Sequence, residues 1–490
     1  MRIQKKVTGF LVLLVFFFSF MGSLVPSAQA AEANKTYTIA TDTTFPPFEY
    51  QDASGNYVGI DLDLLKAIAE DQGFKYRLQP LGFNAAVQAL QSGNVDGVIA
   101  GMSITDERKQ TFDFSDSYFE SGPIMGVDAK NTAIMSYEDL RGLRVAVKTG
   151  TEGATFAESI KDQYGFSIVT FDDSPQLIEE VKAGGSAAYF EDYPVVAYGI
   201  AQGNGMKMPL PKEKGGSYGF AVNKGQDAEL LKMFNTGLAN LKESGKYNEI
   251  VAGYLGESFA SEGGEIEIAA TEQMSGFELI GASMPAFLKG MGLTLYYTIV
   301  SLFFAFILGL IFGSMKVGHN KLLRGVATVF VDIFRGIPLL ILAFFIYFAI
   351  PQALGFTMPI WTAAILALSL NAGAYVTEII RGGIQSIDKG QMEAARSLGV
   401  PYRTAMRKII MPQAVKVMIP SFINQMVITL KDTSIMSIIG LVELTQSGKL
   451  VVASTYRSFE VWLTIGIMYL IVITILTKIA DRLERRVSRG

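Results

Sequence analysis

The segment between Lys389 and Lys416 decides the fold of the C-terminal half. It contains Glu393-Ala394-Ala395, then Gly399, then Ile409-Ile410-Met411-Pro412. Long apolar stretches, Ile360–Ile380 and Val417–Ile439, lie on either side of it. A polar, helix-forming segment between two membrane-spanning stretches cannot lie in lipid, so we expect a loop that faces water. The many basic residues between the two apolar stretches predict the cytoplasmic side of the membrane: Arg381, Lys389, Arg396, Arg403, Arg407, Lys408 and Lys416.

Composition indicates a chain that is partly soluble and partly embedded in a membrane. Half of the 490 residues are hydrophobic and only 18% are charged, which is apolar for a soluble protein. The sequence has no Cys and one His, His319. Disulfides, Cys-based zinc sites and thiol nucleophiles are therefore excluded, and little acid–base chemistry that depends on His remains. We predict a protein that is not an enzyme, with no catalytic residue, no metal site and no cofactor.

Charge divides the chain into two parts. From Gly264 onward there are 20 basic residues (Lys and Arg) and 13 acidic residues (Asp and Glu). The first 263 residues hold 22 basic and 33 acidic residues. An acidic part followed by a basic part fits an exported domain joined to a membrane domain with positive inner loops. Binding to nucleic acid is not expected, because the basic residues lie in short segments that flank apolar stretches.

The N-terminus is typical of a secretory signal. Arg2, Lys5 and Lys6 precede the apolar run Phe10–Phe20, and Ala28-Gln29-Ala30 offers a small-x-small cleavage site. We predict a signal peptide over residues 1–30, with an uncleaved anchor as the alternative. Either form exports the domain that follows.

Residues 31–256 alternate between strand-like and helix-like patterns. Thr36–Ala40 and Val95–Ala100 are apolar and strand-like, whereas Leu62–Asp71 has helical spacing. Such alternation predicts an α/β domain with mainly parallel sheets and helices on both faces. We divide it into a first lobe (35–122 and 218–256) and a second lobe (123–217). Gly, Ser and Glu dominate residues 257–282, which we predict to be a linker.

Residues 283–490 are predicted to form an all-α membrane domain. About 20 apolar residues are needed for one crossing, and five stretches qualify as candidates. Crossings that begin outside put the C-terminus in the cytoplasm, in agreement with the basic residues at the end of the sequence. Lys431 and Asp432 lie within the fourth stretch and are expected to face protein or a cavity. The five stretches are Leu293–Met315, Pro338–Leu354, Ile360–Ile380, Val417–Ile439 and Val461–Ile479.

The cytoplasmic loop, residues 390–413, resembles the EAA loop of ABC importer permeases. That loop has Glu-Ala-Ala, three residues, Gly, nine residues and Ile-x-Leu-Pro; here Met411 replaces Leu. The resemblance implies that the loop docks on a separate ATPase subunit. It also implies a homodimer of the permease domain. The sequence contains no Gly-x4-Gly-Lys-Ser/Thr phosphate-binding loop of its own. The residues implied in ATPase coupling are Glu393, Ala394, Ala395, Gly399 and Pro412.

Two further segments of the membrane half, Phe334–Leu340 and Leu430–Ile435, resemble polar amino-acid permeases. The first half of the chain resembles the polar amino-acid family of periplasmic-type binding proteins, in particular glutamine-binding proteins. This resemblance implies a bilobed, type II receptor fold. The segments that carry it are Thr41–Glu49, Gly101–Arg108, Lys148–Glu152, Glu191-Asp192 and Gly245–Ile250.

A free amino acid has one carboxylate and one ammonium group, and the site must match both. Arg is best suited to grip a carboxylate in bidentate fashion, and we predict Arg108 for this role and Asp192 for the ammonium. Taken alone, Arg108 could be a solvated helix-start residue and Asp192 a helix cap. An amino acid held by both would bridge the two lobes. The full predicted ligand-binding set is Asp42, Phe45, Phe83, Ala100, Gly101, Ser103, Arg108, Lys148, Thr151, Glu152, Glu191 and Asp192.

Specificity for the ligand side chain stays open between two classes. The glutamine-binding pattern expects His where Glu191 stands and Gly where Glu152 stands. Two carboxylates disfavour an anionic ligand; they can accept from an amide or attract a cation that stacks on Phe45 and Phe83. We therefore predict import of glutamine, with arginine, lysine or histidine as the alternative.

A ligand-gated channel or a membrane-anchored sensor with the same receptor fold is the other alternative. Channels of that type insert the pore between the two lobes, whereas all the apolar stretches here follow the complete receptor. We expect a multi-pass protein of the cell membrane with its receptor domain outside.

Overall fold

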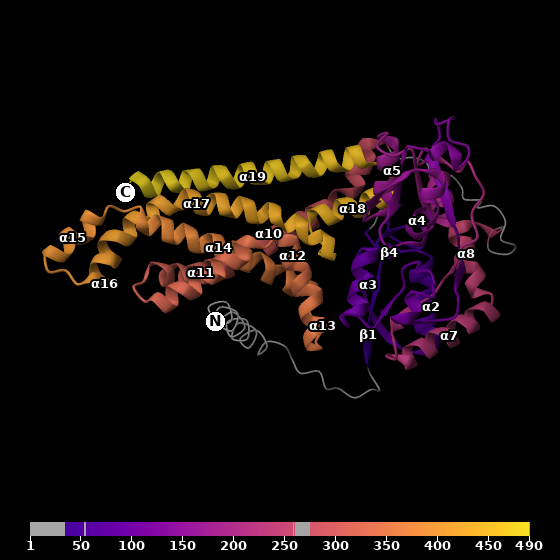
Figure 1. Cartoon of the computed structure of the whole chain (residues 1–490), viewed down its shortest axis with the longest axis horizontal. Coiled ribbons are helices and arrows are strands. Elements are labelled where there is room, and N and C mark those ends of the chain that lie inside the picture. The colour runs from indigo at the N-terminus through magenta and orange to yellow at the C-terminus, as the bar shows by residue number, and fades with distance from the viewer. Residues whose placement is uncertain (1–34, 53–54, 258, 260–274, 490) are drawn as a thin grey trace.

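The computed structural model describes residues 35–52, 55–257, 259 and 275–489. The predicted signal peptide and most of the predicted linker lie outside these ranges. The described chain forms an α/β part, at one end of the molecule, and a helical part that extends away from it (Figure 1).

The first sheet of the α/β part has the strand order β5-β1-β6-β15-β7. β1 is parallel to β5 and β6, whereas β15 returns antiparallel from much later in the chain. The apolar face of α2 packs on this sheet and buries Leu64, Leu65 and Ile68. The strands are β1 (Thr36–Thr41), β5 (Lys75–Pro80), β6 (Gly97–Val98), β7 (Phe112–Phe114) and β15 (Ala221–Asn223), and the helices are α2 (Ile60–Gln72), α3 (Phe83–Gln91), α7 (Ala228–Glu243) and α8 (Lys246–Leu255).

The second sheet has the order β11-β10-β12-β9-β13. β10 is parallel to β11 and β12, and β9 is antiparallel to β12. The predicted α/β class is confirmed, but each sheet also contains antiparallel strands where the chain crosses between the sheets. The strands are β9 (Pro123–Asp128), β10 (Arg144–Lys148), β11 (Ser167–Phe171), β12 (Ala188–Asp192) and β13 (Met206–Lys207), and the helices are α4 (Glu152–Tyr164), α5 (Ser174–Lys182) and α6 (Tyr193–Ala201).

Two smaller sheets lie beside these. One joins β2 (Thr44–Phe45), β3 (Glu49–Gln51) and β4 (Tyr57–Val58), and the other joins β8 (Phe119–Glu120) and β14 (Ser217–Tyr218). β2 begins three residues after the end of β1, so its position is tied to the carboxyl edge of the first sheet.

The helical part contains three helices long and apolar enough to cross a membrane, among the described residues: α10, α14 and residues 458–482 of α19. A fourth span results if α11 and the helices after it, which are bent by 104°, count as one. The predicted total of five is thus not confirmed, because α17 contains Lys416, Gln425 and Lys431, which lower its hydropathy. The bounds are α10 (Gly276–Val317), α11 (Lys321–Gly336), α12 (Leu339–Phe344), α13 (Ile350–Leu354), α14 (Ile360–Gln385), α17 (Met411–Asp432), α18 (Leu444–Thr455) and α19 (Ser458–Arg489).

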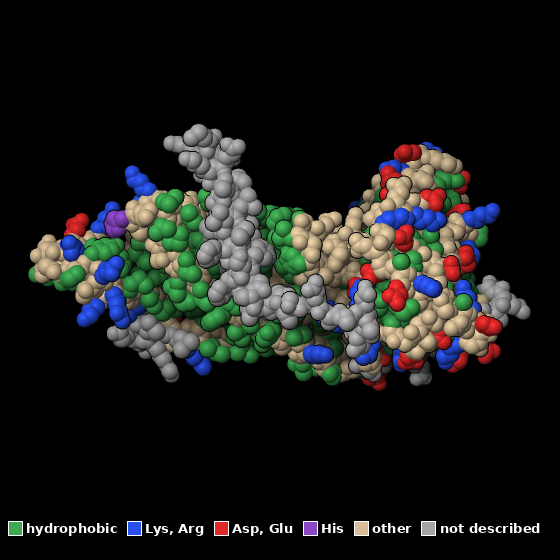
Figure 2. Space-filling view, turned by 90° about the horizontal axis from the view of Figure 1, so that it is seen from below, with side chains coloured by type: hydrophobic (Ala, Val, Ile, Leu, Met, Phe, Trp, Pro, Cys, Tyr) green, Lys and Arg blue, Asp and Glu red, His purple; other side chains and the backbone are tan. Residues whose placement is uncertain are grey.

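A broad band of hydrophobic side chains covers the helical part, and Lys and Arg gather at its far tip (Figure 2). Exposed residues in this part include Ile299, Phe303 and Leu310 of α10 and Leu470 of α19. Large exposed apolar areas are stable only against lipid or another protein, so this band matches the expected membrane contact.

The loop between α14 and α17 folds into two short helices, α15 (Lys389–Ser397) and α16 (Tyr402–Ala405). They form the tip farthest from the α/β part (Figure 1). Gly399 lies just after α15 with a φ of 80°, a conformation that favours glycine and lets the chain reverse.

The α/β part contacts the helical part directly. Asn94 Nδ2 donates to the carbonyl of Tyr347 (2.7 Å), and the amide of Met358 donates to Asn94 Oδ1 (3.2 Å). On the other sheet, Lys449 of α18 pairs with Asp173 at 3.1 Å. Helix α18 also packs on β2, β3 and α5, so it touches both halves of the α/β part.

Close packing of α10 on α14 depends on small residues. A Cβ added at Gly309 would lie 2.2 Å from Val376 Cγ1, whereas one added at Gly292 of the same helix would meet nothing within 4 Å. We therefore expect Gly309→Ala to destabilise the helical part by about 1–3 kcal/mol through overpacking. Gly292→Ala is the matched control. Thermal unfolding of both variants in detergent measures the effect, and equal melting temperatures would contradict this packing.

Candidate functional site

A pocket lies between the carboxyl edges of the two main sheets. Ten residues line it, and all ten belong to the set predicted from the sequence. The first-sheet side contributes Phe45, Phe83, Ala100, Gly101, Ser103 and Arg108, and the second-sheet side contributes Lys148, Thr151, Glu152 and Asp192.

Arg108 is held by main-chain carbonyls from both sides of the pocket. Its Nη1 donates to the carbonyl of Ser103 (2.7 Å) and its Nη2 to the carbonyl of Gly150 (2.6 Å). The guanidinium also lies over the Phe83 ring, 5.5 Å from its centroid. Burial lowers the pKa of Arg108, but from so high a value that the group stays charged. Its remaining N–H donors are suited to a carboxylate.

Helix α4 begins at the second-sheet wall of the pocket. Thr151 caps it, accepting from the amide of Ala154 (3.3 Å) and donating to the carbonyl of Lys148 (2.8 Å). Glu152 Oε1 accepts from the amide of Gly216 (2.8 Å). Its Oε2 is buried and has no hydrogen-bond partner in the described part of the chain, which leaves one acceptor for a polar group in the pocket.

Asp192 ends β12 and is 3% exposed. Its Oδ2 accepts from the hydroxyl of Tyr218, and its Oδ1 has no partner among the residues described. Burial, assisted by the charge of Glu191, raises the pKa of Asp192 to about 7. A nearby cation favours the ionised form, so an ammonium group beside Oδ1 would satisfy both the hydrogen bond and the charge.

Lys148 and Asp42 form a buried ion pair at the same edge. Both side chains are 1% exposed. The amine lies 4.7 Å from the centroid of Phe45 and 5.6 Å from that of Phe83. Burial opposes the charge on the amine, but the carboxylates of Asp42 and Glu191 outweigh it and raise the pKa of Lys148.

Two predicted ligand-binding residues do not line this pocket. Asp42 lies behind Lys148, because its carboxylate is engaged by that amine and by the amides of Thr43 and Thr44. Glu191 points to the opposite side from Asp192, because consecutive residues of a strand face opposite sides of the sheet. Of the two carboxylates expected beside the ligand side chain, Glu152 lines this pocket and Glu191 does not.

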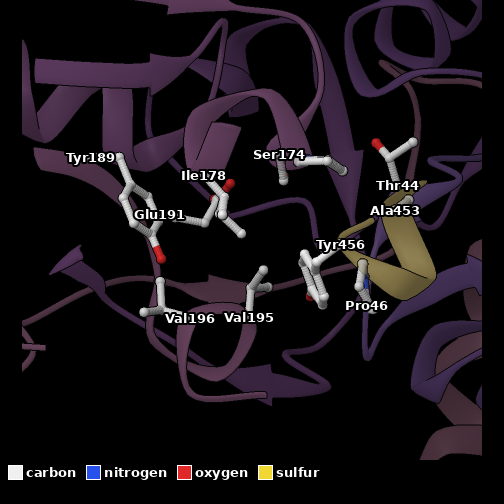
Figure 3. Close-up of a pocket in the computed structure, with 11 residues that line it drawn as sticks. Thr44, Pro46, Ser174, Ile178, Tyr189, Glu191, Val195, Val196, Ala453 and Tyr456 are labelled. Carbon is white, nitrogen blue, oxygen red and sulfur yellow. The ribbon is translucent and has the colours of Figure 1, made fainter. Parts of the chain in front are cut away.

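Glu191 faces a second pocket, at the contact with the helical part (Figure 3). Thr44 and Pro46 line it from one sheet, Val195 and Val196 from α6, and Ala453 and Tyr456 from the end of α18. Tyr456 has a φ of 55°, which is rare outside glycine. A Cβ added at Gly199 of α6 would lie 3.2 Å from its hydroxyl and 2.4 Å from Asn204 Nδ2, so the tyrosine packs closely on α6.

Sequence reasoning missed Tyr456 and Tyr218. Tyr218 holds Asp192 through a hydroxyl contact that spans 26 residues of sequence, and Tyr456 comes from the other domain. No local pattern marks either residue, because each role depends on tertiary contact.

Four of the predicted coupling residues lie on or just after α15, at the far tip, and Pro412 is the second residue of α17 (Figure 1). Glu393 and Ala394 are exposed, whereas Ala395 is buried. Leu398, between α15 and Gly399, is 83% exposed.

Two family models match this chain. Residues 37–257 match bacterial extracellular solute-binding proteins, family 3, and residues 305–489 match the binding-protein-dependent transport system inner membrane component. The two matches share no residue.

Curated relatives match the helical part. The arginine transport system permease protein ArtQ of Bacillus subtilis is 38% identical over 205 residues, which is 42% of this chain and 94% of the relative. The glutamine transport system permease protein GlnP of Escherichia coli is 36% identical over 210 residues. The match covers 43% of this chain and 96% of that relative.

Among solved structures, the second substrate-binding domain of Lactococcus lactis GlnP is 40% identical, with a TM-score of 0.37. The match covers 46% of this chain and 98% of that one. The chain therefore belongs to the family of amino-acid ABC transport permeases, with a solute-binding domain of family 3 fused ahead of its inner-membrane component.

Proposed function

We propose that this chain captures a polar amino acid outside the cell, glutamine first, and passes it to its own permease domain for ATP-driven import. The observation that carries this proposal is the single pocket lined by Arg108 and Asp192 from opposite sheets. The ligand carboxylate would bind Arg108 and its ammonium would bind Asp192 Oδ1. An amino acid in this pose bridges the two sheets, so binding favours their closed arrangement.

Lys148 supports an amide over a cationic ligand side chain. Its amine is fixed between Asp42 and the rings of Phe45 and Phe83. An amide oxygen can accept from this amine while the amide nitrogen donates to Glu152 Oε2. A guanidinium or ammonium in the same place would meet a buried like charge.

A basic amino acid stays the second candidate. The named relatives include one arginine and one glutamine permease, with similar identities to this chain. Glu152 and Asp192 also give the pocket two carboxylates. An ion channel or a sensor has less support, because the relatives are named as transport permeases.

The rest of the assembly follows from the helical part. We infer that α15 and α16 dock on a separate ATPase subunit and that two permease domains form a homodimer. The basic loop then lies in the cytoplasm with the C-terminus, and the receptor lies outside. In this proposal residues 1–30 are the signal peptide, 31–256 the receptor, 257–282 the linker and 283–490 the permease domain.

We further infer that α18 is the element by which the permease holds the receptor. Lys449 and Asp173 lie 3.1 Å apart, with only 19% and 11% of their side chains exposed. Asp173 precedes Ser174, whose hydroxyl lies 3.4 Å from the amine of Lys148 in the ligand pocket. The contact is therefore linked through Ser174 to Lys148, a group that would touch the ligand.

Arg108→Ala should weaken glutamine binding by at least about thirtyfold, because truncating one partner of a buried charge pair costs about 2–5 kcal/mol. Calorimetric titration of the purified wild-type and variant chains with each standard amino acid measures the change in affinity. Lys109→Ala is the control, since that neighbour is exposed and pairs with Asp106. Undiminished binding by Arg108→Ala would remove the proposed anchor, and a wild-type chain that binds no amino acid would reject the ligand class.

Lys148→Met should raise the affinity for arginine relative to glutamine by at least about tenfold. The change leaves Asp42 as a buried, uncompensated charge, at a cost of about 3–5 kcal/mol that a cationic ligand partly recovers. Competition binding of the two amino acids to wild type and variant gives the ratio. The control is Lys224→Met, at an exposed ion pair with Asp113. If the wild-type chain already prefers arginine, the basic amino-acid alternative is correct.

Lys449→Asp should reduce amino-acid uptake by at least about tenfold without changing ligand affinity, since two like charges placed together cost several kcal/mol. The second change Asp173→Lys should restore uptake, because it reverses both charges. Cells that make the chain with its ATPase are assayed for uptake of labelled glutamine, with Lys246→Glu as an exposed control. Absence of rescue by the double variant would show that the pair does not join receptor to permease.

A further inference from the structure

Two carboxyl groups lie behind the ligand pocket and have no part in the proposed ligand contacts. Glu49 of β3 and Asp61 of α2 are both 0% exposed. Asp61 Oδ2 accepts from the amide of Gly101 (2.8 Å) and from the hydroxyl of Tyr118 (2.7 Å). Asp61 Oδ1 and both oxygens of Glu49 have no donor within the described ranges.

Glu49 and Asp61 are neighbours in the fold, because the amide of Asp61 donates to the carbonyl of Phe48 (3.0 Å), the residue before Glu49, and α2 packs on β3. Two neighbouring carboxyl groups that are both fully buried do not ionise together, because burial removes the solvent that would stabilise the second charge. The other titratable groups around them are Asp42, which adds negative charge, Tyr118 and Tyr247, and Lys148, which is already paired with Asp42. The pair must therefore keep one proton.

The geometry also decides which group holds the proton. Asp61 receives two hydrogen bonds, which stabilise its charge, whereas Glu49 receives none from the described residues. Burial, followed by the charges of Asp61 and Asp42, raises the pKa of Glu49 well above its ordinary value. The hydroxyl of a neutral Glu49 can donate to Asp61 Oδ1. This one hydrogen bond would satisfy both Asp61 Oδ1 and the protonated oxygen of Glu49.

We propose that Glu49 is a protonated carboxyl that donates to Asp61, and that this acid pair positions the first-lobe wall of the amino-acid pocket. Glu49 is paired in register with Phe45 on the neighbouring strand, and Asp61 holds the amide of Gly101. Phe45 and Gly101 both line the pocket. They are in close contact, since a Cβ added at Gly101 would lie 2.5 Å from the Phe45 ring. The shared proton thus joins the two segments that form this wall.

The proposal has a defined pH dependence. Because the pKa of Glu49 is raised in the folded chain, its stabilising contribution is complete below the ordinary pKa of a Glu side chain. The contribution declines as pH rises above that value and is lost once pH passes the raised pKa. Above it, two like charges face each other between β3 and α2, and the wall formed by Phe45 and Gly101 loosens. Ligand affinity should therefore fall at alkaline pH by up to about tenfold per pH unit.

The test compares the full-length chain with its Glu49→Gln variant. The amide of Gln donates from the same place and does not titrate, so glutamine affinity at neutral pH should stay within about threefold of wild type. The alkaline fall specific to wild type should be absent from the variant. Deprotonation of the ligand ammonium at high pH is common to both chains, so the ratio of their affinities is the measured quantity. Glu249→Gln, an exposed residue of α8, is the control and should keep the wild-type profile.

A second readout does not need the ligand. The infrared band of a protonated carboxyl group should be present in wild type at neutral pH and missing in Glu49→Gln, and thermal stability should show the same loss of alkaline sensitivity. The affinity measurements rest on the proposed function, whereas the infrared band and the thermal stability do not. A wrong ligand class can therefore be told apart from a wrong assignment of the proton to Glu49. Identical infrared spectra, or a Glu49→Gln variant that folds but loses glutamine binding at neutral pH, would overturn the proposal.

Discussion

The buried contact between Lys148 and Asp42 joins the carboxyl ends of β10 and β1, one from each main sheet. Taking two charges out of water is costly, and the cost is recovered only when the two groups meet directly. Neither group could be buried alone, so the approach of the two sheets at this edge and the charge pair depend on each other. Phe45 and Phe83 lie against the amine and help to exclude water from the same edge.

This constraint gives the pocket its charge pattern. Two cations, Arg108 and Lys148, and the carboxyl groups of Glu152 and Asp192 line the same small pocket. Other polar groups hold all four side chains, and each carboxyl group keeps one oxygen that has no hydrogen-bond partner among the described residues. Arg108 is fixed by carbonyls, Asp192 by Tyr218 and Glu152 by Gly216. Groups held in place in this way lose little conformational freedom when a ligand binds, which would reduce the free-energy cost of binding the proposed amino acid. The proposed acid pair of Glu49 and Asp61, one layer behind the pocket, would likewise hold Phe45 and Gly101 in place.

Strand β12 reaches both the pocket between the sheets and the contact with the helical part, because its consecutive side chains point to opposite sides. Asp192 faces the proposed ligand, and Glu191, its neighbour on β12, faces the pocket that Tyr456 helps to form. A shift of this strand would move both residues together. Helix α18 contacts strands of one small sheet and α5 beside the second main sheet, so the helical part touches both halves of the receptor at the place where they meet.

The sequence by itself determined the division into an α/β part and a helical part, the family, and the ten residues that line the pocket between the sheets. Those residues were predictable because motifs such as Gly101–Arg108 and Lys148–Glu152 follow the ends of strands. Parallel strands bring their carboxyl ends together, so residues at those ends are predictable as neighbours. Only the tertiary structure decided that Asp42 lies behind Lys148, that Glu191 faces the permease and that Tyr218 and Tyr456 take part. The number of membrane crossings was also left to the structure, since the chain bends by 104° between α11 and α12 and α17 carries Lys416, Gln425 and Lys431 among its apolar residues. These features depend on contacts between residues distant in sequence, and periodicity along the chain carries no information about which distant side chains will meet.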